Sequence, residues 1–273
     1  MSSRRMPLIA KVNKLHNMPS PIRSNPYLAF RQPTPGARIY LFCFHHAGGG
    51  ASVFRQWSNS LPPEIEVCPV QLPGREDRLR DPPFTDLSSL IEALDDALSP
   101  DLEKPFALFG HSMGAIFCFE LARSLCRKRG VCPLQLFVSG SRAPHLPNPE
   151  PPIHDLPRNL FLEKLKELNG IPENVLREPD MIEFFLPILR ADIKLLESYV
   201  FAESAPLNCP ITAFGGLEDK IASRAELGAW SDHTRDTFKL QMFPGDHFFM
   251  RPARQPLLQA IAADLISRMD HIE

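Results

Sequence analysis

The chain has 273 residues, of which 44% are hydrophobic and 23% charged, as is typical of a globular protein. Its formal net charge of −2 argues against nucleic-acid binding, and no apolar run approaches the roughly 20 residues that span a bilayer, so we expect neither a nucleic acid nor a membrane as a partner. The six cysteines are scattered without a C-x-x-C pair, which predicts reduced, buried side chains in a cytoplasmic protein.

The N-terminal segment differs from the rest of the chain. Residues 1–38 contain no Asp or Glu but carry several Lys and Arg residues, and they lack the apolar region of a secretory signal. We predict a mobile basic arm over 1–37 and a single domain over 38–273. An organelle transit peptide and an arm that docks an acidic partner are the alternatives.

From residue 38 onward, short apolar runs alternate with amphipathic stretches. The runs are nearly continuous in apolar content, as in strands buried on both faces, and cover 38–44, 65–71, 106–110, 134–140, 211–216 and 238–243. Helices are predicted between and after them, over 86–98, 114–128, 222–232 and 254–268. This alternation predicts an α/β protein with a mostly parallel central sheet flanked by helices, whose ligand site lies beyond the carboxyl ends of the strands.

One region, about 141–206, interrupts the alternation. It contains helical patterns over 156–168 and 180–199, the second of which is rich in large apolar side chains. An ordinary helical insertion is one interpretation. We favour a helical lid because the region follows a strand end on the ligand-binding edge. Three lid residues are predicted to touch substrate, although they would serve equally well in a core: Phe184, Phe185 and Leu189.

The segment Gly110-His111-Ser112-Met113-Gly114 has the pattern G-x-S-x-G between a predicted strand and a predicted helix. This is the pattern of a nucleophile elbow, in which glycines allow a sharp turn that exposes the serine hydroxyl above the sheet. A serine that only caps a helix would not require both glycines. Ser112 is therefore the predicted nucleophile.

A serine nucleophile needs a base, which in this architecture follows it in sequence. His247 lies just after the last predicted strand, and the adjacent Phe248 can shield it from water and contact substrate. His233 is the rival, but its position in a polar helix predicts a solvated surface residue.

The acid that orients the histidine should follow the preceding strand. Asp219 is the predicted acid, and Glu218 is the local alternative. Asp246 adjoins the histidine in sequence and is poorly placed to hold its ring.

The glycine-rich loop over 43–52 follows the first predicted strand. Its backbone can face a reacting carbonyl, and the N–H groups of Ala47 and Met113 are the predicted oxyanion donors. The loop lacks the G-K-[ST] ending of a P-loop and the pattern G-x-G-x-x-G, so a phosphate-binding loop is not predicted. His45 and His46 are adjacent, and no third metal-binding residue stands at a suitable spacing from them, so no metal site is predicted.

Several separated motifs together resemble the free-standing type II thioesterases of nonribosomal peptide and polyketide biosynthesis. The resemblance covers about residues 39–269 and rests on FHHAGGGAS, QLPGREDR (71–78), FGHSMGA (109–115), LPILRAD (186–192), FGGLED (214–219) and FPGDHFF (243–249). It implies an α/β-hydrolase fold with a lid, a triad of Ser112, Asp219 and His247, and Ala47 and Met113 as oxyanion donors. His45 stands where family members usually have Pro, and Lys220 follows the acid where Pro is common.

The implied activity is hydrolysis of acyl thioesters on the phosphopantetheine arms of acyl or peptidyl carrier proteins, which edits mis-primed or stalled synthases. No cofactor is implied, and a monomer is the default. A medium-chain fatty acyl carrier thioesterase and a chain-releasing thioesterase are alternative enzymes. A catalytically silent module that binds carriers is the alternative from a different class.

Overall fold

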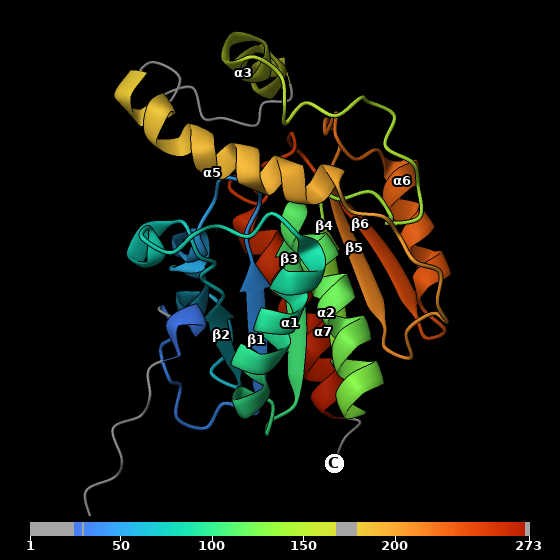
Figure 1. Ribbon diagram of the computed structural model, residues 1–273. Helices are drawn as coiled ribbons and strands as arrows, with labels where there is room; N and C mark the ends of the chain where they lie inside the picture. The colour runs from blue at the N-terminus through green and yellow to red at the C-terminus, as the bar shows by residue number, and fades with distance from the viewer. Residues whose placement is uncertain (1–24, 29, 168–178, 271–273) are drawn as a thin grey trace, which may run out of the picture.

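The computed structural model describes residues 25–28, 30–167 and 179–270, and in this part of the chain the predicted parallel sheet is present (Figure 1). Its six strands have the order β2-β1-β3-β4-β5-β6, and all five pairings are parallel. The strands are β1 (Ile39–Phe44), β2 (Ile65–Pro69), β3 (Phe106–His111), β4 (Gln135–Ser139), β5 (Ile211–Gly216) and β6 (Phe238–Phe243). Each lies within two residues of its predicted position, and the predicted α/β class with a parallel central sheet flanked by helices is confirmed.

The α-helices of the described residues also follow the predicted order. They are α1 (Leu87–Leu98), α2 (Met113–Arg129), α3 (Arg158–Glu167), α5 (Pro179–Glu197), α6 (Arg224–Gly228) and α7 (Arg254–Met269). Short 3₁₀ turns occur at η2 (Pro26–Leu28), η3 (Ala51–Phe54), η4 (Trp57–Asn59), η5 (Glu76–Arg78), η6 (Ser99–Asp101) and η7 (Ala229–His233). None of these described helices is long and apolar enough to cross a bilayer.

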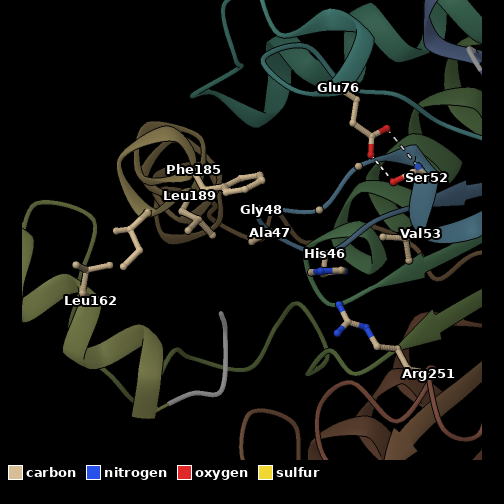
Figure 2. Close-up of a pocket in the computed structure, with 13 residues that line it drawn as sticks. His46, Ala47, Gly48, Ser52, Val53, Glu76, Leu162, Phe185, Leu189 and Arg251 are labelled. Atoms are coloured by element: carbon tan, nitrogen blue, oxygen red, sulfur yellow. Dashed lines mark hydrogen bonds between the residues drawn. The ribbon is translucent and has the colours of Figure 1, made fainter. Parts of the chain in front are cut away.

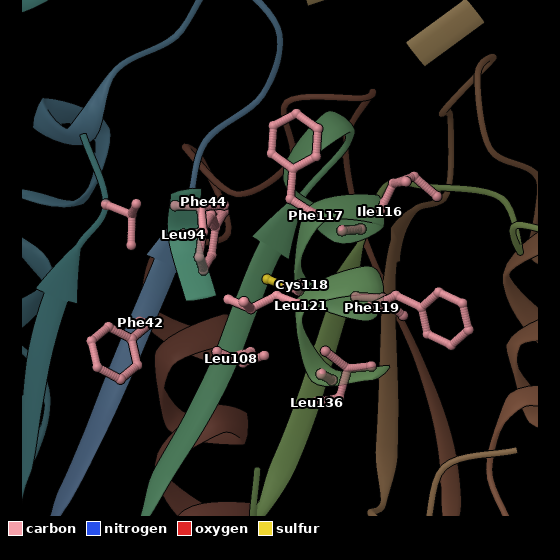
Figure 3. Packing of buried hydrophobic residues seen from close by; sticks show 14 of the residues in the cluster. Phe42, Phe44, Leu94, Leu108, Ile116, Phe117, Cys118, Phe119, Leu121 and Leu136 are labelled. Atoms are coloured by element: carbon pink, nitrogen blue, oxygen red, sulfur yellow. The ribbon is translucent and has the colours of Figure 1, made fainter. Parts of the chain in front are cut away.

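Both faces of the sheet are buried, because successive residues of a strand point to opposite sides. On β1, Phe42 and Phe44 belong to the core layer that includes α1 and α2, whereas Leu41 and Cys43 pack in the layer of α7. Figure 3 shows the first layer, where sheet residues meet the helices, among them Phe42, Phe44, Leu108, Leu136, Leu94, Phe117 and Leu121. Burial on both faces explains why the strands are nearly continuous apolar runs.

The insertion between β4 and β5 contains α3 and α5, as predicted. Figure 1 shows α5 lying across the edge of the sheet toward which the strand arrows point, with α3 beyond it. This edge is where a parallel sheet presents its functional loops. The insertion therefore lies over the carboxyl edge of the sheet.

The end of the predicted basic arm is bound to the domain. Tyr27 and Leu28 are buried in the α1 side of the core. Arg31 forms ion pairs with Glu66 and Asp101, each at 2.5 Å. The prediction of a mobile arm is wrong for these residues. Their partners are distant in the sequence, so the composition of the arm alone does not indicate the contacts. The earlier residues of the arm lie outside the described part of the chain.

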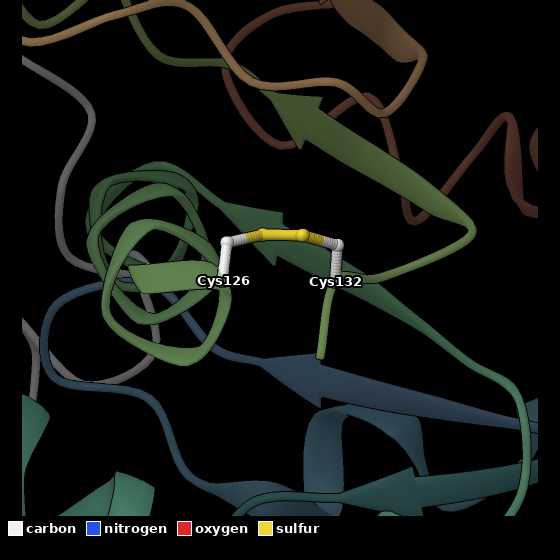
Figure 4. Close-up of a disulfide and its surroundings, with 2 residues drawn as sticks. All are labelled: Cys126 and Cys132. Carbon is white, nitrogen blue, oxygen red and sulfur yellow. A yellow bond between two sulfur atoms is a disulfide. The ribbon is translucent and has the colours of Figure 1, made fainter. Parts of the chain in front are cut away.

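Two cysteines form a disulfide that the sequence analysis did not predict. Cys126, on the last turns of α2, is bonded to Cys132, which precedes β4 (Figure 4). Gly130 ends the helix in the left-handed conformation, with φ 67°, and reverses the chain so that the two Cα atoms lie 4.8 Å apart. The prediction of reduced cysteines is therefore wrong for this pair. The other four cysteines are free and buried: Cys43, Cys68, Cys118 and Cys209.

Candidate active site

Ser112 lies at a strained turn between β3 and α2. Its φ and ψ are 55° and −115°, and Glu76 is the other non-glycine residue with a positive φ in the described part of the chain. Such a conformation costs on the order of 1–3 kcal/mol and persists only where the surrounding structure enforces it. The serine is partly exposed, whereas His111 and Met113 beside it are buried. The turn thus presents the hydroxyl, as the G-x-S-x-G pattern predicts.

The two glycines of the pattern are required by close backbone contacts. A Cβ atom on Gly110 would lie 2.1 Å from the Gly114 carbonyl oxygen, and one on Gly114 would lie 2.3 Å from the carbonyl oxygen of Phe44. Both distances are far shorter than a van der Waals contact. Glycine at these positions allows α2 to start directly against the ends of β3 and β1.

His247 and Asp219 are joined by a hydrogen bond. His247 Nδ1 lies 2.9 Å from Asp219 Oδ2, and the two side chains are 5% and 0% exposed. The other carboxylate oxygen, Oδ1, accepts backbone N–H groups of Ile221 at 2.8 Å and Ala222 at 3.3 Å. With Nδ1 assigned as the donor, Nε2 is left as an acceptor. Glu218, the alternative acid, is exposed to solvent.

The loops after β5 and β6 meet closely enough to bring this pair together. The backbone N–H of Glu218 donates to Gly245 O at 3.0 Å. A Cβ atom on Gly216 would lie 2.3 Å from the carbonyl oxygen of Asp246. The absence of a side chain at Gly216 therefore permits the approach that places the histidine loop on the acid loop.

Gly140, which follows β4, lies near both Ser112 and His247. Ser112 N donates to Ser139 O at 2.7 Å, and Ser112 and Gly140 line the same cavity. A Cβ atom on Gly140 would lie 3.3 Å from His247 Cε1. Among the described residues no hydrogen bond joins Ser112 Oγ to His247; catalytic hydrogen bonds often tighten only when substrate binds.

The predicted oxyanion donors, Ala47 and Met113, come from adjacent segments. Met113 is the first residue of α2, and Ala47 follows β1, which pairs with β3. The contact between Gly114 and the backbone of Phe44 and His45 places the start of the helix against the start of the glycine loop. Both amides therefore belong to neighbouring backbones at the carboxyl edge of the sheet.

Three further histidines lie around this edge: His45 and His111 are buried, and His46 is half-buried. Burial, and then the charge of Arg75, lowers the pKa of His45 from 6.5 to about 3. The pKa of His46 is also lowered to about 3, by burial and then by His45. Burial and the neighbouring His247 lower the pKa of His111 well below its usual value. These rings are neutral in the folded protein at any pH near 7.

The lowered pKa values of His45 and His46 predict a loss of stability in mild acid. Unfolded histidines bind protons below about pH 6.5, whereas folded His45 and His46 do so only near pH 3, so acid favours the unfolded state in this window. We expect His45→Gln to reduce the pH slope of the unfolding free energy by on the order of 1 kcal/mol per pH unit. Urea denaturation between pH 7.5 and 5.0 measures both slopes, and equal slopes for the variant and the original protein would contradict the prediction.

His233 is not the surface residue that its sequence context predicts. It is buried, its Nε2 lies 2.7 Å from His145 Nδ1, and its ring packs against Trp230. Burial, and then His145, lowers the pKa of His233 to about 4. The turn η7 directs the side chain inward, away from the polar face that the predicted helix would have offered.

Two cavities lie at the carboxyl edge of the sheet. The first, of about 260 Å³, is lined by Ser112 and Met113 together with Gly140, Arg142 and Tyr199. The second, of about 230 Å³, lies between the glycine loop and the helices α3 and α5 (Figure 2). Its lining combines His46, Ala47 and the loop backbone with apolar side chains from the two helices, namely Leu162, Ile182, Phe185 and Leu189.

The four predicted substrate contacts fall in different places. Phe185 and Leu189 line the second cavity, one helical turn apart. Phe184 is 49% exposed and lines neither cavity, because adjacent helix residues point about 100° apart. Phe248 packs its ring on His46 and His247, with centroid distances of 5.0 and 5.3 Å. Its ring thus lies against that of His247, and Phe248 lines neither of the two cavities.

Metal ligands are not gathered at this site. Within the described ranges, no group of three or more His, Cys, Asp or Glu side chains could hold a metal ion. Arg75 and Asp192 belong to the motifs QLPGREDR and LPILRAD, which predict no role for either residue. The structure brings them together beside the glycine loop.

Comparison with known proteins identifies similar chains. Residues 40–265 match the family model described as the thioesterase domain. The chain is 46% identical over 237 residues to linear gramicidin dehydrogenase LgrE of Brevibacillus parabrevis, covering 86% of this chain and 90% of LgrE.

Solved structures show the same similarity. The RedJ thioesterase from the prodiginine pathway of Streptomyces coelicolor has a TM-score of 0.79 and 40% identity, covering 85% of this chain and 92% of RedJ. The type II thioesterase BorB from the borrelidin biosynthetic cluster has a TM-score of 0.76 and 34% identity, covering 86% of this chain and 94% of BorB.

Proposed function

This chain belongs to the thioesterase family, and on that premise we propose that it hydrolyses acyl thioesters carried on the phosphopantetheine arms of carrier proteins. Type II thioesterases are among its similar proteins, one of them from a combined nonribosomal peptide and polyketide pathway. The proposed role is editing, in which stray or stalled acyl groups are removed so that a synthase can continue. The partner is then an acyl or peptidyl carrier protein, and the enzyme acts as a monomer.

The observation that carries this proposal is the hydrogen bond between Asp219 and His247, at the same sheet edge as the strained Ser112. In the proposed mechanism, His247 Nε2 takes the proton of Ser112 Oγ as the oxygen attacks the thioester carbonyl. Asp219 holds the ring and stabilises its charged form. The developing oxyanion is bound by the N–H groups of Ala47 and Met113.

Collapse of this intermediate breaks the carbon–sulfur bond. His247 gives its proton to the departing phosphopantetheine thiol and leaves an ester on Ser112. The same histidine then removes a proton from water, which attacks the ester carbonyl. The bond between that carbon and Ser112 Oγ breaks, Oγ takes the proton back from His247, and the carboxylic acid is released. We assign the acyl group to the apolar cavity beside Phe185 and Leu189, since Ala47 lies in the lining of that cavity.

The test is release of acyl groups from a loaded carrier protein, followed by intact mass. Acetyl, aminoacyl and longer acyl groups are compared, and Ser112→Ala is the control. We expect broad unloading of short groups that falls by at least about 10³-fold in Ser112→Ala, because the nucleophile is lost. Thermal unfolding should show that this variant remains folded.

The other outcomes distinguish the alternatives. Fast release of a single long chain would indicate a medium-chain or chain-releasing thioesterase. Binding of the carrier without any release, together with no labelling of Ser112 by a fluorophosphonate, would indicate a silent binding module. Undiminished release by Ser112→Ala would contradict the proposed mechanism itself.

A further inference from the structure

A buried ion pair joins α5 to the loop after β2. Arg75 Nη1 lies 2.7 Å from Asp192 Oδ2, and Arg75 Nη2 lies 2.8 Å from Asp192 Oδ1. The two side chains are 5% and 3% exposed. A bidentate pair of this kind fixes the geometry of both partners more tightly than a single contact does. The helix is therefore held at this point in one orientation.

The same carboxylate also binds the glycine loop. The backbone N–H of Gly48 donates to Asp192 Oδ2 at 2.7 Å. On the other side of the loop, Ala51 N donates to Gln71 Oε1 at 3.1 Å, and Gln71 Nε2 donates to Arg75 O at 3.2 Å. Asp192, Arg75 and Gln71 thus form a connected set of hydrogen bonds around the loop that contains Ala47.

Packing strengthens this connection between helix and loop. Gly48 has a φ of 71°, and a Cβ atom there would lie 2.5 Å from Leu189 Cδ2. Leu189 and Asp192 are three residues apart and therefore lie on the same face of α5. This face contacts the loop through both an apolar side chain and a charged one.

We infer that Asp192 is a positioning residue for the oxyanion site: it orients the Gly48 peptide, and through it the N–H of Ala47, only while α5 is docked on the loop. The inference rests on the proposed function. Gly48 directly follows Ala47, so a change in the Gly48 peptide changes the adjoining backbone. Movement of α5 away from the loop would remove the carboxylate from Gly48 and leave the oxyanion site incomplete.

If the pair between Arg75 and Asp192 had only a structural role, its loss would affect stability but not turnover. Loss of one partner of a buried pair commonly costs several kcal/mol of stability, whatever the function of the pair. In that case the molecules that remain folded keep the original kcat. The separation of kcat from KM and from stability therefore distinguishes positioning from anchoring.

The experiment compares Asp192→Ala with Asp95→Asn, a variant of a buried carboxylate elsewhere. Asp95 pairs with Arg129 and accepts from Ser124 Oγ at 3.0 Å, near the end of α2 that lies opposite Ser112. We expect Asp192→Ala to lower kcat on a small acyl thioester by 10- to 100-fold with KM within about threefold. Asp95→Asn should lower the Tm without changing kcat.

Hydrogen exchange supplies a readout that does not depend on activity. The Gly48 amide should exchange faster in Asp192→Ala, because its buried acceptor is gone. If Asp192→Ala does not fold, Asp192→Asn replaces it; a single amide oxygen cannot serve Gly48 and both Arg75 nitrogens, so kcat should fall at least about fivefold.

Folded variants with unchanged kcat and unchanged Gly48 exchange would overturn the inference. If the original protein hydrolyses no thioester, the proposed function fails instead, and the exchange data decide the contact between Asp192 and the loop on their own. Faster exchange then supports that contact, and unchanged exchange overturns it.

Discussion

Asp219→Asn is expected to lower kcat for thioester hydrolysis by about 10⁴-fold while leaving the fold intact. An amide at this position can donate to His247 Nδ1, which stabilises the tautomer whose Nε2 carries a proton and cannot accept the proton of Ser112. The carboxylate is buried and accepts from two backbone N–H groups, so the replacement keeps its place in the loop. Steady-state kinetics with a small acyl thioester measures the effect.

Glu218→Gln is the matched control, because it makes the same chemical change one residue earlier. Glu218 is exposed to solvent, so the kcat of Glu218→Gln should stay within a factor of about two of that of the original protein. A large loss in Glu218→Gln with a small one in Asp219→Asn would reverse the assignment of the acid.

Gly114→Ala is expected to damage both stability and activity. The added Cβ would lie 2.3 Å from the Phe44 oxygen and 2.9 Å from the His45 oxygen, and both are backbone atoms that cannot rotate away. The start of α2 must therefore shift, and with it the N–H of Met113. We expect the free energy of unfolding to fall by about 1–3 kcal/mol, and the Tm to fall by roughly 2–4 °C for each kcal/mol lost. We also expect kcat to fall at least about tenfold, because the Met113 N–H is displaced.

Gly228→Ala provides the contrast within the same protein. Gly228 has helical dihedral angles, and a Cβ there would meet only Leu240 Cδ2, at 4.0 Å. Alanine at an uncrowded helical position stabilises by up to about 1 kcal/mol. If Gly114→Ala melts and turns over like Gly228→Ala, the close approach of α2 to β1 is not a constraint in solution.

The sheet could be predicted from the sequence because burial on both faces produces a local signal. β3 and β4 are buried throughout and apolar in most of their residues, so their runs stand out without knowledge of their neighbours. Strand–helix alternation then fixed parallel pairing, and parallel pairing places the residues that follow β3, β5 and β6 at one edge. Ser112, Asp219 and His247 could be grouped for this reason, although they are far apart in the chain.

Contacts that depend on tertiary distance could not be predicted in the same way. Arg75 and Asp192 meet across 117 positions, and no periodicity in either segment indicates a partner. The inward turn of His233 and the ion pairs of Arg31 are equally non-local. The disulfide is close in sequence, but it depends on the left-handed Gly130, whose conformation the residue type permits without requiring it.

The order of the strands along the chain has a consequence for biosynthesis on the ribosome. β6 is an edge strand that pairs only with β5 in this sheet, and the loop after it supplies His247. At ~5–20 residues per second, a nascent chain carries Ser112 for on the order of ten seconds before His247 has been synthesised. During that time the proposed nucleophile lacks its proposed base, and a serine without a base is a weak nucleophile. On the proposed mechanism, we therefore expect a nascent chain that still lacks His247 to be inert toward acyl thioesters, and the onset of hydrolysis to report completion of the sheet.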